Sequence, residues 1–168
     1  MLGLPMGKGI LDSIAELPAA RARELLAKLD EHEYELACAS VMAPGADVLL
    51  AALVERGVRL GIVTQNNLRN LETTLEATGL RGYFQGDGFV TRETGAPKPR
   101  PDGILRLLAA WDTTPTDAVM IGNHRIDLEA GRAAGTATVH VDPKGIFEWS
   151  EHADLEVRSL RDMLALLD

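Results

Sequence analysis

The sequence predicts an α/β fold in which helices flank a parallel β-sheet. Two short apolar segments, 58–64 and 118–121, end in polar residues and are each followed by a stretch with helical spacing of leucine or alanine. Strands that alternate with helices form βα units, and such units build parallel sheets with right-handed crossovers. The composition agrees: 46% of the residues are hydrophobic and only 4% are aromatic, a balance typical of α/β packing and not of disorder.

Size and charge exclude several classes of function. A chain of 168 residues fits one domain with a substantial core, and a net charge of −8 argues against nucleic acid or anionic membranes as partners. Cys38 is the only cysteine, which excludes an internal disulfide and a thiolate metal cage. Because the sequence also lacks a long apolar run and a signal peptide, we expect a soluble, cytoplasmic protein.

The elements follow from apolar spacing and from Gly and Pro punctuation. The charged residues between Arg21 and Glu35 are interpreted as the solvated face of a helix. The expected helices are 10–17, 18–39, 46–56, 68–78, 102–111, one from near Asp127, and 160–167. The expected strands are 58–64, 89–91, 118–121 and 136–141, with a Gly- and Pro-rich loop at 92–101.

The segment 118–135, AVMIGNHRIDLEAGRAAG, predicts a site at the carboxyl end of a buried strand. Asn123 and Asp127 place two oxygen-bearing side chains four residues apart across the loop that follows the strand. Mg²⁺ takes such ligands together with water and substrate phosphate. The alternative interpretation is that Asp127 only caps the following helix.

Two further loops carry polar groups that suit the same site. Thr64 ends the strand 58–64, with Gln65 and Asn66 after it, and Lys98 lies between two prolines that restrict its backbone. Taken singly, Thr64 is also an ordinary strand-end residue and Lys98 an ordinary solvated lysine. Together, a hydroxyl, loop amides, a fixed ammonium and a carboxylate-held cation are what phosphoryl transfer uses.

Three segments in this order, VRLGIVTQNN, APKPRPDGI and MIGNHRIDLEAGRAAG, resemble known motifs. They are similar to the second, third and fourth motifs of the haloacid dehalogenase-like hydrolases, in particular the phosphoglycolate-phosphatase-like branch with a helical cap. The resemblance implies a Rossmann-like core at 43–168 and a small helical cap at 1–42. It also implies a Mg²⁺-dependent phosphatase acting on a small phosphorylated metabolite.

The resemblance assigns roles residue by residue. Thr64 would hydrogen-bond the phosphoryl group, with Gln65 and Asn66 lining the same loop, and Lys98 would bridge the nucleophile and the phosphate. Asp127 would bind Mg²⁺.

One position departs from the family's fourth motif. Asn123 stands where the family usually has a second aspartate. Asparagine offers an oxygen without a charge, so we expect weaker metal affinity.

The first motif of the family, D-x-D-G-T, has no counterpart in the sequence. No D-x-D occurs, and Asp12, the nearest acidic candidate, lies in a helical pattern and not in a strand. Without an aspartate nucleophile we expect this chain by itself to be a very poor phosphatase. We also expect that the natural protein begins upstream of Met1.

In the family the first strand lies between the strands expected here at 58–64 and 118–121. Its absence would leave two unpaired edges, which favours self-association, unless the two strands pair directly or another chain fills the gap.

Two other functions stay open at this point. A non-catalytic relative that binds a ligand fits Asn123 and the missing aspartate. A dehalogenase of the same family fits less well, because Lys98 and Asp127 suit Mg²⁺-dependent phosphoryl transfer. Dinucleotide binding has no support, since no G-x-G-x-x-G opens a helix after a strand.

Overall fold

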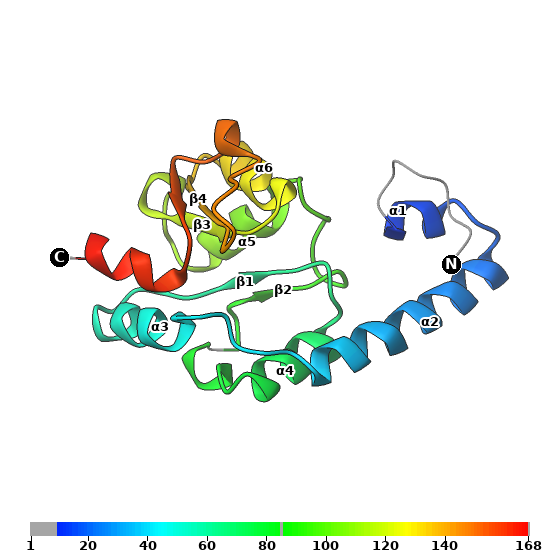
Figure 1. Ribbon diagram of the computed structural model, residues 1–168. Coiled ribbons are helices and arrows are strands. Elements are labelled where there is room, and N and C mark those ends of the chain that lie inside the picture. The colour runs from blue at the N-terminus through cyan, green and yellow to red at the C-terminus, as the bar shows by residue number, and fades with distance from the viewer. Residues whose placement is uncertain (1–9, 85, 168) are drawn as a thin grey trace.

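The computed structural model describes residues 10–84 and 86–167 and has the α/β architecture with parallel strands that the sequence predicts (Figure 1). The α-helices are α1 (Ile10–Ala15), α2 (Ala19–Cys38), α3 (Ala46–Glu55), α4 (Leu68–Ala77), α5 (Asp102–Ala110) and α6 (Arg125–Ala134). The strands are β1 (Ile62–Val63), β2 (Phe89–Val90), β3 (Val119–Gly122), β4 (Ala137–Val141) and β5 (Leu155–Val157). Short 3₁₀-helices are η1 (Arg81–Tyr83), η2 (Pro115–Asp117), η3 (Ser150–His152) and η4 (Leu160–Leu166).

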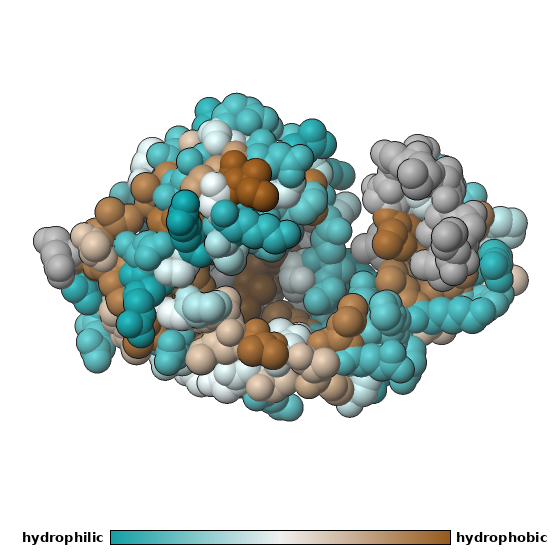
Figure 2. Space-filling model, viewed as in Figure 1, coloured by the Kyte–Doolittle hydropathy of each residue, from teal (hydrophilic) through white to brown (hydrophobic). Residues whose placement is uncertain are grey.

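The sheet is divided into two parts. β1 pairs in parallel with β2, and separately β3, β4 and β5 form a parallel sheet in that order. Among the residues that the structure describes, β1 and β3 do not pair with each other. Figure 2 shows the molecule hollowed at its middle, with hydrophobic surface inside the hollow. Direct pairing of the two strands, one of the outcomes considered from sequence, is therefore not found.

β1 is much shorter than predicted. Only Ile62 and Val63 of the expected strand 58–64 are in the ladder. The Ile62 amide donates to the carbonyl of Gly88, directly before β2 (2.8 Å), and the Thr64 amide donates to the carbonyl of Val90, in β2 (2.9 Å). Since backbone groups alternate sides along a strand, those of Val63 face away from β2. Because β1 has a partner strand on one side only, no further strand hydrogen bonds form before Ile62.

α5 joins the two parts of the sheet. Its Ile104 and Leu108 form one buried apolar cluster with Ala130 and Ala134 of α6. Val63 from β1 and residues 118 and 120 from the β3 region pack against the same cluster. Burial of this apolar surface is the interaction that holds the two half-sheets in one molecule.

Gly131 lets α6 lie close to the strands beneath it. A Cβ at Gly131 would come within 2.7 Å of Met120 Cβ and of Thr138 Cγ2. We expect Gly131→Ala to lower the free energy of unfolding by about 1–3 kcal/mol despite alanine's better helix propensity, because the core would be overpacked. Urea denaturation measures this. Gly82→Ala, whose Cβ would meet nothing within 4 Å, is the control and should change stability by less than about 0.5 kcal/mol.

The C-terminal segment differs from the prediction. The expected α-helix 160–167 is the 3₁₀-helix η4, capped by Ser159 and Asp162 and packed against α3. None of its residues is buried, so packing gives little support to an α-helix. β5 was not predicted, because three residues after a polar turn give too short a pattern.

At the other end of the chain, α2 extends from α4 toward α1 as a long arm (Figure 1). Ile14 of α1 is buried against Leu25 and Leu29 of α2. None of the helices described in residues 10–84 and 86–167 is long and apolar enough to cross a membrane.

Candidate active site

Lys98 reaches from one half of the sheet to the other. It lies in the loop between β2 and α5, where its peptide bond to Pro99 is cis. Its Nζ donates a 2.8 Å hydrogen bond to the carbonyl of Val63 in β1 and forms a 2.6 Å ion pair with Oδ1 of Asp127 in α6. Both side chains are largely buried, at 13% and 10% exposure. The ammonium is therefore fixed between the carboxyl ends of β1 and β3.

Asp127 both caps its helix and faces the site. α6 begins at Arg125, two residues earlier than predicted, because His124 is the N-cap. Oδ2 of Asp127 accepts a hydrogen bond from the His124 amide (3.1 Å), which completes a capping box, while Oδ1 faces Lys98. A Cβ at Gly122 would lie 2.2 Å from Asp127 Cβ, so the strand ends in glycine where this carboxylate packs on it.

The Thr64 loop adjoins Lys98. The Asn66 amide donates to Thr64 Oγ1 (3.1 Å), and Gln65 Nε2 donates to the carbonyl of Lys98 (2.9 Å). The structure thus places Thr64, Gln65, Lys98 and Asp127 at one edge of the two half-sheets. Asn66 lines a cavity of about 110 Å³ between α2 and α4.

Asn123 lies in the loop between β3 and α6, four residues before Asp127. It is exposed and lines a cavity of about 220 Å³ over the end of β4, together with His140, Asp142 and Trp149. The buried His140 ring packs 5.4 Å from the Trp149 ring, and the His124 ring lies 4.9 Å from the Trp149 ring. His140 is thus a buried packing residue, and His124 caps α6.

The donor set can be compared with what Mg²⁺ requires. Both oxygens of Asp127 already have partners, and the described part of the chain contains no group of three His, Cys, Asp or Glu residues placed to hold a metal. Mg²⁺ commonly keeps several waters and binds through one or two carboxylates and a substrate phosphate. The residues present therefore fit an open site with Asp127 as its carboxylate, and not a closed protein cage.

Asp142 organises the loop that borders this cavity. Its carboxylate accepts hydrogen bonds from the amides of Lys144, Ile146 and Phe147. The bond from Phe147 is the main cause that holds the pKa of Asp142 below its ordinary value of 3.8.

A carboxyl with a depressed pKa stabilises the fold above its ordinary pKa, and this contribution is lost as the pH falls through the depressed value. We therefore expect the amide NMR signals of Lys144, Ile146 and Phe147 to shift together on acidification below pH 3.8. In Asp142→Asn they should already be shifted at neutral pH, with no further acid transition. Retention of the acid transition in that variant would assign it to another group.

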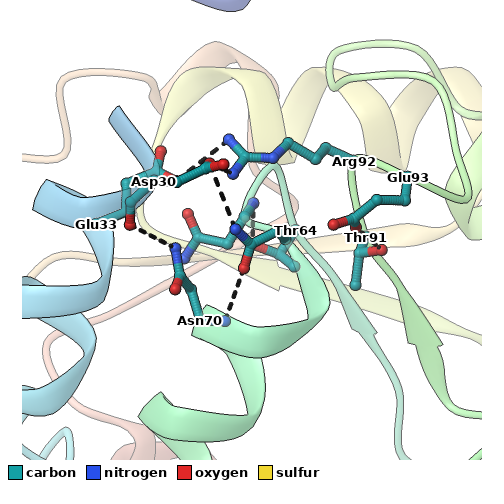
Figure 3. A network of polar contacts seen from close by, with 9 residues as sticks. Asp30, Glu33, Thr64, Asn70, Thr91, Arg92 and Glu93 are labelled. Atoms are coloured by element: carbon teal, nitrogen blue, oxygen red, sulfur yellow. Dashed lines mark hydrogen bonds and ion pairs between the residues drawn. The ribbon is translucent and has the colours of Figure 1, made fainter. Parts of the chain in front are cut away.

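One polar network was not predicted from sequence (Figure 3). Arg92, two residues after β2, pairs with Asp30 and Glu33 of α2. Burial raises the pKa of Glu33, an effect that the Arg92 charge partly offsets. Interpreting Glu33 as part of a solvated face was wrong, since its side chain is only 20% exposed, whereas Asp30 is 43% exposed and stays partly solvated. Helical spacing alone does not show which charges meet a partner from a distant loop.

The side chain of Asp12 lies outside the described residues, so its proposed role as an acidic candidate stays a prediction.

The profile of the haloacid dehalogenase-like hydrolases matches residues 13–141. The chain belongs to this family. Among curated relatives, an uncharacterized hydrolase of Saccharomyces cerevisiae is 29% identical over 74% of this chain and 59% of its own length. The pyrophosphatase PpaX of Listeria monocytogenes is 27% identical over 96% of this chain and 76% of its own length. The chain thus spans between about three fifths and three quarters of the length of these two relatives.

Solved structures of the family share the fold. CbbY from Rhodobacter sphaeroides, in complex with phosphate, is 25% identical, with a TM-score of 0.76 over 91% of this chain and 70% of CbbY. A putative phosphoglycolate phosphatase from Lactobacillus plantarum, 19% identical, has a TM-score of 0.77 over 95% of this chain and 77% of its own. These matches confirm the predicted haloacid dehalogenase-like architecture.

Proposed function

We propose that this chain is the phosphate-binding part of a Mg²⁺-dependent phosphatase that acts on a small phosphorylated metabolite in the cytoplasm. The observation that carries the proposal is the position of Lys98, whose ammonium is fixed by Val63 and Asp127 at the carboxyl ends of β1 and β3. Ligands of α/β sheets bind at this edge. The Listeria relative that is named a pyrophosphatase and the phosphate complex of CbbY support the choice of phosphate.

The residues of this chain would bind and orient the phosphoryl group. Lys98 places a positive charge where the charge of the transferring oxygens develops, and the Thr64 hydroxyl and its loop amides supply hydrogen bonds. Asp127 and Asn123 would hold Mg²⁺, which when bound neutralises further charge on the phosphate. Gln65 fixes the Lys98 backbone through its 2.9 Å hydrogen bond, and so keeps the ammonium at a constant position relative to Thr64.

The nucleophile is proposed to come from a strand seated between β1 and β3. The sequence contains no D-x-D, and without an aspartate in that position the chain alone would turn over phosphate esters very poorly. The gap between β1 and β3, which do not pair with each other in the described residues, and the hollow seen in Figure 2 leave room for such a strand. The alternative is that a second copy of the chain pairs with the same strand edges. Sedimentation velocity, which detects such a dimer, distinguishes this alternative from an added strand.

Two measurements test this proposal. Titration of the chain with inorganic phosphate by ³¹P NMR is expected to show saturable binding. A version extended upstream by a segment that ends in D-x-D-G-T is expected to release phosphate from p-nitrophenyl phosphate with Mg²⁺ and to lose this activity with EDTA, while the unextended chain stays inactive. Absence of phosphate binding, or activity that ignores EDTA, would refute the assignment.

A non-catalytic binding protein is the second candidate. The observation that favours it is the ion pair itself, because Lys98 and Asp127 neutralise each other and Asn123 adds no charge. If Mg²⁺ binding to the extended chain stays in the millimolar range and Asn123→Asp does not tighten it, this second function replaces the first.

A further inference from the structure

Arg92 connects the α2 arm to the end of β2. Its guanidinium forms ion pairs with Asp30 and, at 3.2 Å, with Oε2 of Glu33, both on α2 (Figure 3). The Arg92 side chain is only 15% exposed and that of Glu33 only 20%. The Arg92 Nη1 and Glu33 Oε2 atoms are buried and make no hydrogen bond in the described structure, so each has the other's charge as its partner.

The same cluster is bonded to the Thr64 loop. The Arg92 amide donates to the Asn66 carbonyl (3.1 Å), and Asn67 Nδ2 donates to the Asp30 carboxylate (3.4 Å). Asn67 is also the N-cap of α4, and the Asn66 amide donates to Thr64 Oγ1. Two independent routes, one through the backbone of Arg92 and one through Asp30, therefore join the arm to the loop that carries Thr64.

Packing between the arm and α4 is incomplete at this point. The cavity of about 110 Å³ between α2 and α4 is lined by Glu33, Ala37 and Asn66 among others, so the two helices are not tightly packed there. A buried ion pair contributes little net stability, since desolvation of both charges offsets their attraction, but it defines geometry. Here charge pairing adds to helix packing in setting the distance between the arm and the loop.

We propose that Arg92 is a positioning residue: by holding Asp30 and Glu33 it keeps the Thr64–Asn67 loop in its phosphate-binding conformation. That the loop binds phosphate rests on the proposed function. The coupling of the arm to the loop rests only on the contacts described above. Lysine at position 92 keeps the charge but lacks the planar fork that reaches two carboxylates at once. Arg92→Lys is therefore the informative substitution.

The test combines hydrogen exchange with phosphate titration. In Arg92→Lys we expect the amides of Asn66 and Asn70, whose acceptors are the side chains of Thr64 and Asn67, to exchange about tenfold faster, and inorganic phosphate to bind about tenfold more weakly. Amides of α5 should be unchanged. Glu24→Gln is the matched control, because it removes exposed ion pairs with Arg21 and Lys28 on the same helix.

The outcomes separate the two proposals. Unchanged exchange at Asn66 and Asn70 in Arg92→Lys overturns the positioning role, and so does equal acceleration in α5, which would indicate general destabilisation. If the wild-type chain binds no phosphate, the proposed function fails, while the exchange rates still decide the coupling. Asp30→Ala, which removes both the acceptor of Asn67 Nδ2 and one ion-pair partner of Arg92, is expected to reproduce the effect and replaces Arg92→Lys if that variant does not fold.

Discussion

Replacing Lys98 by methionine should abolish measurable phosphate binding by this chain and lower turnover of the upstream-extended chain by about 10²–10³-fold. The reason is that the Lys98 ammonium lies at the edge where both half-sheets end, with 13% of its side chain exposed. Methionine has a similar length and packs in the same space without the charge. Phosphorus NMR titration measures the first effect and p-nitrophenyl phosphate hydrolysis the second.

The control for this prediction is Lys28→Met. Lys28 also pairs with a carboxylate, Glu24, at 2.8 Å, but on the exposed face of α2. Its replacement should leave phosphate affinity and turnover within a factor of two, roughly the effect of one distant screened charge. If Lys98→Met behaves like Lys28→Met, the phosphate site lies elsewhere and the assignment of Lys98 is wrong.

Asp127→Asn should reduce the free energy of unfolding by roughly 3–5 kcal/mol, the typical effect of leaving one charge of a buried ion pair without its partner. Asparagine still accepts a hydrogen bond from the His124 amide, so the helix cap survives and the loss reports on Lys98. Adding Lys98→Met to this variant removes the unpaired ammonium. The double variant is expected to be more stable than Asp127→Asn alone, with a coupling of about 1–3 kcal/mol.

Chemical denaturation of the four proteins in this cycle gives the coupling directly. The same cycle on Glu24 and Lys28, whose side chains are 48% and 62% exposed, provides the comparison and should give less than about 0.5 kcal/mol. Additive effects of Asp127→Asn and Lys98→Met would contradict the ion pair as an energetic unit.

The sequence was sufficient to place the three loops of the candidate site because their signals are local. Each signal can be recognised within about ten residues: a strand that ends in Thr64, a lysine between two prolines, and a glycine before a helix that starts with an acidic residue. Parallel strands then bring their ends to one edge, so Lys98 and Asp127 meet although 29 positions separate their numbers. The order of these signals carried the resemblance to the family, and the resemblance then assigned a role to each residue.

Interactions between distant segments were not predictable in the same way. Nothing local indicates that Asp30 and Glu33 face Arg92, which is about sixty positions away in the chain. The length of β1 also depended on its neighbours, because a strand with one partner forms only as much ladder as that partner offers. From the sequence, helix capping and a place in the site are alternatives for Asp127. In the structure its Oδ2 atom caps the helix while its Oδ1 atom pairs with Lys98.

The division of the sheet has a practical consequence for spectroscopy. The chain has two tryptophans, and one lies against each part. The Trp111 ring lies next to Gly61, directly before β1, and the Trp149 ring contacts His124, which follows β3, and His140 of β4. Fluorescence of single-tryptophan variants would therefore follow the two halves independently. Emission from Trp149 would report on the helix cap that carries Asp127, and emission from Trp111 on the edge of β1.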